Sequence, residues 1–158
     1  MTEEASSLPL DFLTRPGPTI SASRIDFNDT PLSEYKDLYA TVLDGVLSEE
    51  ECRTLVAAAE AHNDGMWEPA TINHGGGRQE LALESRNCGR IMWDCPELAE
   101  RLLARVTGWI PELQALDKWP KLTGNRAAMR GEVWKLSRLN ERMRFLRYGP
   151  GQYFSGAG

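Results

Sequence analysis

The residues best suited to metal chemistry in this chain of 158 residues are three cysteines and two histidines, namely Cys52, Cys88, Cys95, His62 and His74. Strong zinc motifs place two ligands within one turn, as C-x-x-C or H-x-x-x-H pairs do, and none of these residues has such a partner. The sequence therefore predicts no zinc site. An odd number of thiols without a secretory signal predicts reduced cysteines.

A glycine-rich stretch, N-H-G-G-G-R at residues 73–78, is the second candidate for chemistry. Glycines ahead of a basic residue can cradle a phosphate, but the G-x-x-x-x-G-K-[ST] frame is absent and no strand leads into a helix here. We predict a flexible surface loop. His62, near the end of a predicted helix, is expected to be a surface residue rather than a ligand.

The most specific pattern lies at residues 140–154, N-E-R-M-R-F-L-R-Y-G-P-G-Q-Y-F. Alternating side chains over residues 143–148 predict a strand, and Gly149, Pro150 and Gly151 predict a turn. A supporting segment, S-R-N-C-G-R, lies at residues 85–90. Together with the elements between residues 39 and 154, these segments resemble the N-terminal part of the prolyl 4-hydroxylase-like 2-oxoglutarate dioxygenases.

The resemblance implies a double-stranded β-helix (jelly-roll) enzyme that binds Fe(II) through two histidines and one carboxylate. Such enzymes hydroxylate a C–H bond while converting 2-oxoglutarate to succinate and CO2, and the intact domain uses Fe(II), 2-oxoglutarate and, in some cases, ascorbate. Tyr148 matches a position whose phenol often donates a hydrogen bond to 2-oxoglutarate. Its alternative role is that of a tyrosine closing the core at a strand end. Phe154 matches the aromatic ahead of the iron motif, where it is expected to pack.

The chain departs from this family at the iron site. The histidine of the H-x-D motif should follow Phe154 by three residues, but Ala157 stands there and the sequence ends at Gly158. The distal histidine and the basic residue that holds the far carboxylate of 2-oxoglutarate are also missing, and His62 and His74 lie too far upstream to replace them. We therefore predict no catalytic residue, no metal ligand and no bound cofactor in this chain alone. We expect an inactive, truncated part of such a domain, with a splice form as the alternative.

The remaining sequence predicts an α+β fold made of the N-terminal helices and first strands of that domain. Residues 1–33, interrupted by four prolines, predict a poorly ordered leader before a partial dioxygenase domain at 34–158. Ser48 and Glu51 fit a capping box for a helix to His62, and Asp94 is expected to cap a helix to about Trp109. Further strands are predicted at residues 39–43, 67–70 and 87–93, and residues 119–131 are ambiguous.

The net charge of −5 is unevenly distributed. Residues 118–147 hold nine basic and two acidic side chains, a net +7, which leaves −12 elsewhere. This segment suggests an alternative function, a non-catalytic binding module for nucleic acid or an acidic partner. We favour a solvated face and do not expect nucleic acid, because no base-stacking aromatic pattern accompanies the charge.

Composition and the N-terminus complete the expectations. The chain is 41% hydrophobic and 26% charged, as in ordinary globular proteins. It opens with acidic residues, and no apolar run approaches the ~18 residues of a membrane span. We expect a cytoplasmic protein, with the nucleus as an alternative, no membrane, and a small-molecule cosubstrate only in a full-length form.

Overall fold

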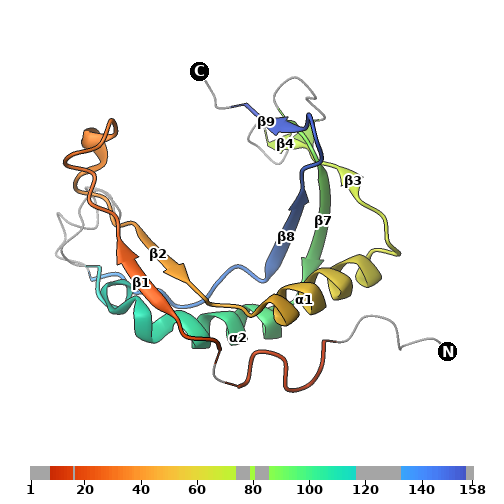
Figure 1. Ribbon diagram of the computed structural model, residues 1–158, viewed down its shortest axis with the longest axis horizontal. Coiled ribbons are helices and arrows are strands. Elements are labelled where there is room, and N and C mark those ends of the chain that lie inside the picture. Colours follow the sequence, from red (N-terminus) through yellow and green to blue (C-terminus); the bar gives the residue numbers. More distant parts are fainter. Residues whose placement is uncertain (1–7, 16, 74–78, 81–85, 117–132, 156–158) are drawn as a thin grey trace. The chain divides into compact units, whose positions relative to one another are not determined.

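The computed structural model describes residues 8–15, 17–73, 79–80, 86–116 and 133–155. Within them the chain is α+β, with two α-helices and several short antiparallel strand pairs (Figure 1). It divides into two compact units: unit 1 comprises Met1–Phe12, Glu50–Pro96 and Glu141–Gly158, and unit 2 comprises Leu13–Glu49 and Glu97–Asn140. Among the described residues the strands form no closed barrel.

Unit 1 is built around an antiparallel sheet in which β7 (Gly89–Asp94) lies between β3 (Glu68–Pro69) and β8 (Arg142–Arg147). Figure 1 shows β7 and β8 side by side along their whole length, in a register that sets Gly89 opposite Arg147 and Ile91 opposite Phe145. Two shorter pairs join β4 (Ile72–Asn73) to β5 (Gln79–Glu80), and β6 (Arg86–Asn87) to β9 (Tyr153–Phe154).

The helix α1 (Glu49–His62) supplies the helical part of unit 1, and it confirms the predicted helix at this place. Its buried residue is Ala59, which joins Ala70, Cys88, Ile91 and Trp93 in the core. The alternation of β8 is also as predicted, since Met143 and Phe145 are half-buried while Arg142 and Arg144 are exposed. Hydrophobic burial on one face of this sheet is what fixes the register of β7 against β8.

Unit 2 contains a strand pair and the second helix. β1 (Ser21–Arg24) pairs with β2 (Thr41–Asp44), and α2 (Pro96–Val106) continues into 3₁₀ turns at Thr107–Trp109 and Pro111–Gln114. Its core includes Leu13, Leu98, Ala99 and Ile110. Beyond these turns, Leu116 and Trp134 form an isolated antiparallel bridge.

Several boundaries differ from the sequence expectations. β1 lies within the stretch expected to be a leader. Its own sequence carries no strand signal, and it forms a strand because it pairs with β2. The helix α2 begins at Pro96, so Asp94 is not its cap: Asp94 ends β7 and its carboxylate accepts two hydrogen bonds from Arg142, both at 2.8 Å. Residues 74–78 of the glycine-rich stretch and residues 119–131 lie outside the described residues.

Neither α1 nor α2 could cross a bilayer, and the part of the chain that the structure describes has no longer apolar helix.

Candidate functional site

The site predicted at Tyr148 lies where β8 ends and a tight turn begins. The turn is closed by a hydrogen bond from the Gln152 amide to the Gly149 carbonyl at 3.0 Å, and the Gly149 amide donates to Oε1 of Gln152 at 2.7 Å. Gly151 has a φ of 78°, which glycine adopts at no steric cost. The predicted turn is therefore confirmed, and it fixes the backbone directly after Tyr148.

A cavity of about 620 Å³ opens beside this turn, entirely within unit 1. Its volume is in the range of small-molecule sites. The phenol-bearing residue Tyr148 is 43% exposed and lines it. The other lining residues come from the strands β3, β6, β7 and β8, from the segments beside them and from the turn: Trp67, Pro69, Asn87, Cys88, Gly89, Arg147, Gly149, Pro150 and Gln152.

Trp67 and Arg147 form one wall of the cavity. The guanidinium carbon of Arg147 lies 4.5 Å from the centre of the Trp67 ring, a distance at which the ring attracts the cation. The indole Nε1 donates to Oε1 of Glu60 at 2.9 Å, and Nη1 of Arg147 lies 3.7 Å from the same oxygen. Gly89 makes this packing possible, because a Cβ there would lie 3.0 Å from Cβ of Trp67.

The two sequence segments that carry the family resemblance are paired strands. Arg86 in β6 lies opposite Phe154 in β9, and the Arg86 guanidinium carbon is 4.5 Å from the centre of the Phe154 ring. Phe154 is nonetheless 59% exposed and does not line the cavity as described. Asn87, from the same segment as Arg86, does line it.

The described residues offer no ligand set that fits iron or zinc. No three His, Cys, Asp or Glu side chains gather among them. His62 stacks on Trp93 with the ring centres 5.2 Å apart, so its ring is engaged in an aromatic contact. The cysteines are free thiols, with Cys88 buried, Cys52 exposed and Cys95 between these extremes. His74 lies outside the described residues.

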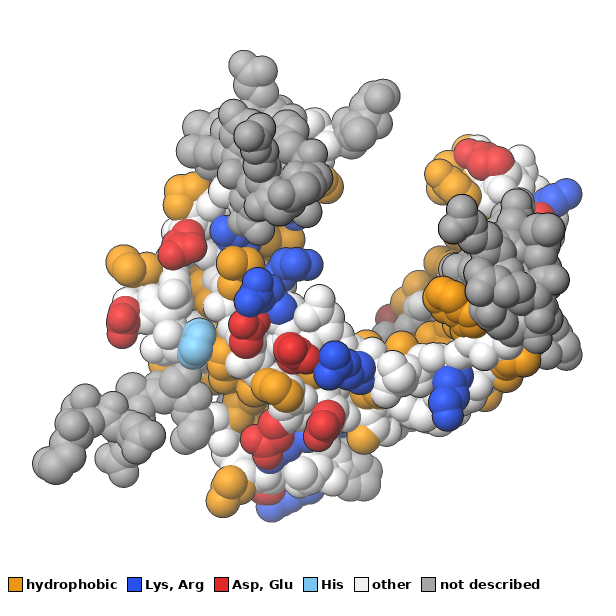
Figure 2. Space-filling view, turned by 180° about the vertical axis from the view of Figure 1, so that it is seen from behind, with side chains coloured by type: hydrophobic (Ala, Val, Ile, Leu, Met, Phe, Trp, Pro, Cys, Tyr) orange, Lys and Arg blue, Asp and Glu red, His pale blue; other side chains and the backbone are white. Residues whose placement is uncertain are grey.

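The basic segment at residues 118–147 is partly neutralised where the structure describes it. Arg142 pairs with Asp94 and Arg147 lies near Glu60. The hydrogen bonds from Arg142 lower the pKa of Asp94 and, in turn, raise the pKa of Arg142. Figure 2 shows acidic and basic side chains interspersed on the face that it presents. Residues 118–132 of the segment lie outside the described residues.

Sequence reasoning singled out Tyr148 but missed the wall that Trp67 and Arg147 form in the same cavity. The adjacency of Arg147 to Tyr148 was a signal for a cation at the cavity. The role of Trp67 had no local signal, because it depends on the pairing of β3 with β7 and on a glycine 22 residues further along the chain.

Comparisons with protein families, with curated proteins and with solved structures gave no match. The residues and their geometry are therefore the ground on which a function can be proposed.

Proposed function

We propose that this chain carries the N-terminal part of a 2-oxoglutarate- and Fe(II)-dependent dioxygenase domain of the prolyl 4-hydroxylase type. In this proposal 2-oxoglutarate would bind in the cavity that Tyr148 lines. The chain by itself would not hydroxylate a substrate, because its described residues offer no ligand set for iron. We also propose that the intact domain has the double-stranded β-helix fold of this family.

The observation that carries the proposal is the pairing of the two segments behind the resemblance. Residues 85–90 and 140–154 are far apart in the sequence, yet β7 pairs with β8 and β6 with β9. Two segments chosen by chance would have no reason to be neighbours in register. Their pairing also sets Asn87 and Tyr148 at one cavity.

The chemistry of the cavity supports a carboxylate ligand. A phenol O–H, a guanidinium and a side-chain amide are all hydrogen-bond donors, and Tyr148, Arg147 and Asn87 supply them. A guanidinium can donate two parallel bonds to one carboxylate. Arg147 is held in place by Trp67, which reduces the side-chain entropy lost when an anion binds.

The first experiment is to sequence the native transcript through and beyond the codon for Gly158. A frame that continues into H-x-D, a distal histidine and a basic residue would support the proposal. A stop codon directly after Gly158 in every transcript would refute the enzyme function for this product. In parallel, the 158-residue chain with Fe(II), ascorbate and 2-oxoglutarate should form no succinate, and succinate formation would contradict the inactivity proposed here.

The role of Tyr148 has its own test in any longer, active form. Tyr148→Phe removes one hydrogen bond and should raise the KM for 2-oxoglutarate about three- to ten-fold while leaving the fold intact. Tyr153→Phe is the matched control, because Tyr153 is 45% exposed on β9 and does not line the cavity as described. Equal KM values in both variants would remove Tyr148 from the site.

The alternative function, a binding module that uses residues 118–147, predicts association with anionic polymers that weakens steeply with salt. No observation among the described residues favours it, since two of its arginines face carboxylates within their own unit. Replacement of Arg138, Arg142 and Arg144 by glutamine tests it: retention on an anionic column should fall if the segment binds, and unchanged retention would exclude it.

A further inference from the structure

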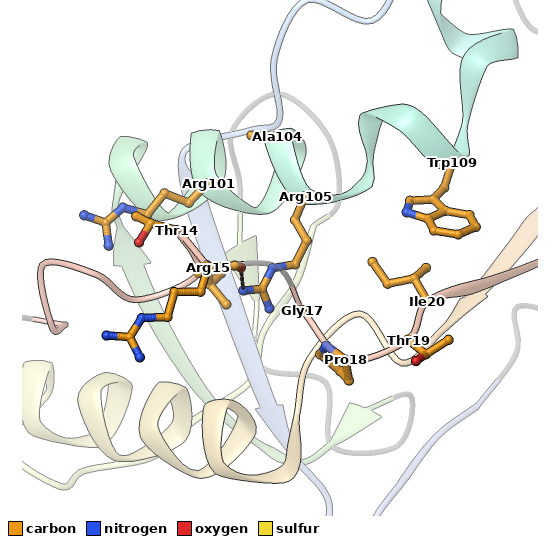
Figure 3. A pocket seen from close by; sticks show the side chains of 11 residues that line it. Thr14, Arg15, Gly17, Pro18, Thr19, Ile20, Arg101, Ala104, Arg105 and Trp109 are labelled. Carbon is orange, nitrogen blue, oxygen red and sulfur yellow. Dashed lines mark hydrogen bonds between the residues drawn. The ribbon is translucent and has the colours of Figure 1, made fainter.

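A second cavity, of about 670 Å³, lies in unit 2 between α2 and residues 13–15 and 17–20 (Figure 3). The cation of its lining that points toward this segment is Arg105. Its Nη1 donates to the Val46 carbonyl at 3.0 Å and its Nη2 to the Arg15 carbonyl at 2.9 Å. Arg105 is therefore committed to the chain itself. The groups that are available to a partner lie instead along β8 in unit 1.

Among the described residues, β8 is the outer strand of its sheet. The order of the strands is β3, β7, β8, so β8 pairs with β7 on one side only, as Figure 1 shows. β8 is six residues long. The backbone amides and carbonyls on the other side of such a strand are a template for pairing with a further strand.

The hydrogen-bond pattern determines which residues of β8 direct their backbone groups outward. In an antiparallel pair, opposite residues alternate between those that exchange hydrogen bonds with each other and those that do not. The Cys95 amide donates to the Glu141 carbonyl at 2.9 Å, one position beyond the pairing of Asp94 with Arg142. The odd-numbered residues 141–147 therefore bond to the β7 side. The even-numbered ones, which include Arg144 and Leu146, direct their amides and carbonyls to the outer edge.

The outer backbone groups of Arg144 and Leu146 are accessible. No hydrogen bond from another described residue reaches them, and both side chains are exposed, that of Leu146 to 39%. His62 of α1 stacks on Trp93, which lies opposite Met143, so α1 contacts the other face of the sheet. Because successive side chains point to opposite faces, Arg144 and Leu146 lie on the face away from this contact.

Arg144 gives the edge a preference for an acidic partner. Its two arginine neighbours along β8 are near carboxylates of their own unit: Arg142 pairs with Asp94, and Arg147 lies 3.7 Å from Glu60. No ion pair joins Arg144 to a carboxylate of the described residues. Opposite charges directly across a strand pair stabilise it, so a strand with a carboxylate opposite Arg144 is favoured.

A second copy of this chain is a poorer occupant of the edge. When two β8 strands pair antiparallel so that Arg142, Arg144 and Leu146 of each copy all find a partner, Arg144 lies directly opposite its counterpart. Like charges directly opposite destabilise a sheet. Charged side chains on an edge strand are also a common means by which proteins prevent self-pairing.

The register of β8 defines the residues that an added antiparallel strand needs. Its residue opposite Leu146 should be apolar, and two positions later the residue opposite Arg144 should be acidic. The residue between these two lies opposite Phe145, which is half-buried on the face that α1 contacts, and should be apolar as well.

We propose that the outer edge of β8 binds an extended segment of a partner protein as an added antiparallel strand, in which two apolar residues precede an acidic residue that lies opposite Arg144. In this mode main-chain hydrogen bonds provide affinity and alternate side chains provide specificity. The proposal does not rest on the function proposed above, because neither Arg144 nor Leu146 lines the Tyr148 cavity as described.

The first measurement is amide hydrogen exchange in the chain alone, followed by NMR. The amides of Met143, Phe145 and Arg147 bond to β7 and should exchange at least about ten-fold more slowly than those of Arg144 and Leu146. Equally slow exchange at Arg144 and Leu146 would overturn the proposal, because the edge would then already be covered. Protection that rises with protein concentration would identify the cover as a second copy.

The second measurement uses the peptide acetyl-T-V-V-E-V-T-amide as the probe. Its first valine is placed opposite Leu146, its second opposite Phe145 and its glutamate opposite Arg144. We expect saturable shifts of the Arg144 and Leu146 amide signals, and both amides should become protected from exchange. The absence of a saturable shift would overturn the proposal.

Methylated forms of this peptide test the backbone pairing. N-methylation of the glutamate removes the amide that donates to the Arg144 carbonyl and should weaken binding at least about ten-fold. N-methylation of the second valine is the matched control, because that amide points away from β8 and binding should be retained. Equal binding of the two methylated peptides would exclude an added strand in this register.

The charge is tested from both sides of the pair. A peptide with lysine in place of glutamate should bind the wild type about three- to ten-fold more weakly, and Arg144→Glu should reverse this preference. Lys135→Glu, the same change at an exposed cation of unit 2, is the matched control and should keep it. Thermal unfolding establishes that each variant is folded. If Arg144→Glu does not fold, Arg144→Gln decides: a folded variant that still prefers the glutamate peptide would refute the proposal.

Discussion

Replacement of Gly89 by alanine tests the packing that forms the wall of the Tyr148 cavity. The new Cβ would lie 3.0 Å from Cβ of Trp67 and 3.6 Å from its Cε3. Carbon atoms pack best at about 3.5–4.0 Å, so the indole would have to retreat by about half an ångström. The indole would then move relative to two partners, the Glu60 carboxylate at 2.9 Å and the Arg147 guanidinium at 4.5 Å.

The magnitude is the difference of two opposing effects. Overpacking of this kind costs about 1–3 kcal/mol. Alanine also restricts the unfolded chain, which stabilises the folded state by about 0.4–1 kcal/mol where the backbone conformation suits it. Gly89 is not among the residues of positive φ, so this second effect applies. The free energy of unfolding should therefore fall by about 0.5–2 kcal/mol.

The assay is urea unfolding followed by far-ultraviolet circular dichroism and tryptophan fluorescence. Gly149→Ala is the matched control in the same unit and at the same cavity, because its Cβ would meet only the Gln152 side chain, at 3.6 Å, an ordinary contact. It should be neutral or slightly stabilising. If Gly89→Ala is as stable as Gly149→Ala, the contact between β7 and Trp67 is not as tight as argued.

A double-mutant cycle identifies the cause. In a Trp67→Leu background the smaller side chain leaves room for the new methyl group, so Gly89→Ala should cost less than in the wild type, by about 0.5–2 kcal/mol. An equal cost in both backgrounds would show that the strain lies in the strand itself and not against Trp67.

Three further predictions concern single features of the fold. Gly45→Ala should destabilise by more than about 1 kcal/mol in urea unfolding, since φ is 70° and the Cβ would lie 2.5 Å from the Thr19 carbonyl oxygen; unchanged stability would contradict the geometry at the end of β2. Leu98→Ala, at a side chain only 1% exposed, should cost about 2–5 kcal/mol, and a cost under 1 kcal/mol would place Leu98 outside the core. The hydrogen bond from Arg142 lowers the pKa of Asp94. The stability that this pair contributes to the folded state is therefore present above the ordinary pKa of 3.8 and is lost as the pH falls through the folded-state pKa. Arg142→Gln should therefore melt below the wild type at pH 7, the difference should vanish in acid, and a difference that persists in acid would refute this assignment.

The elements that could be predicted from the sequence are those whose signals are local. Residues 48–51, S-E-E-E, mark a helix start, and the apolar spacing that follows extends to His62, as α1 does. The alternation of β8 and the glycine-rich turn after it are equally local. Each of these patterns lies within one element, so no distant residue is needed to interpret it.

What could not be predicted depends on pairing across the chain. β1 has a mixed sequence, S-A-S-R, and becomes a strand because β2 pairs with it some twenty residues later. Asp94 has the residue type of a helix cap, but Arg142, 48 residues away, binds its carboxylate. Tertiary contacts override local preference in both cases.

The same distinction applies to the two cavities. Tyr148 could be proposed from sequence because it lies within one recognisable pattern, whereas the cavity of unit 2 combines residues 13–15 and 17–20 with α2, about 85 residues later, and no motif links them. The cation of the Tyr148 cavity, Arg147, lies 3.7 Å from Glu60, so a carboxylate ligand there must compete with that side chain.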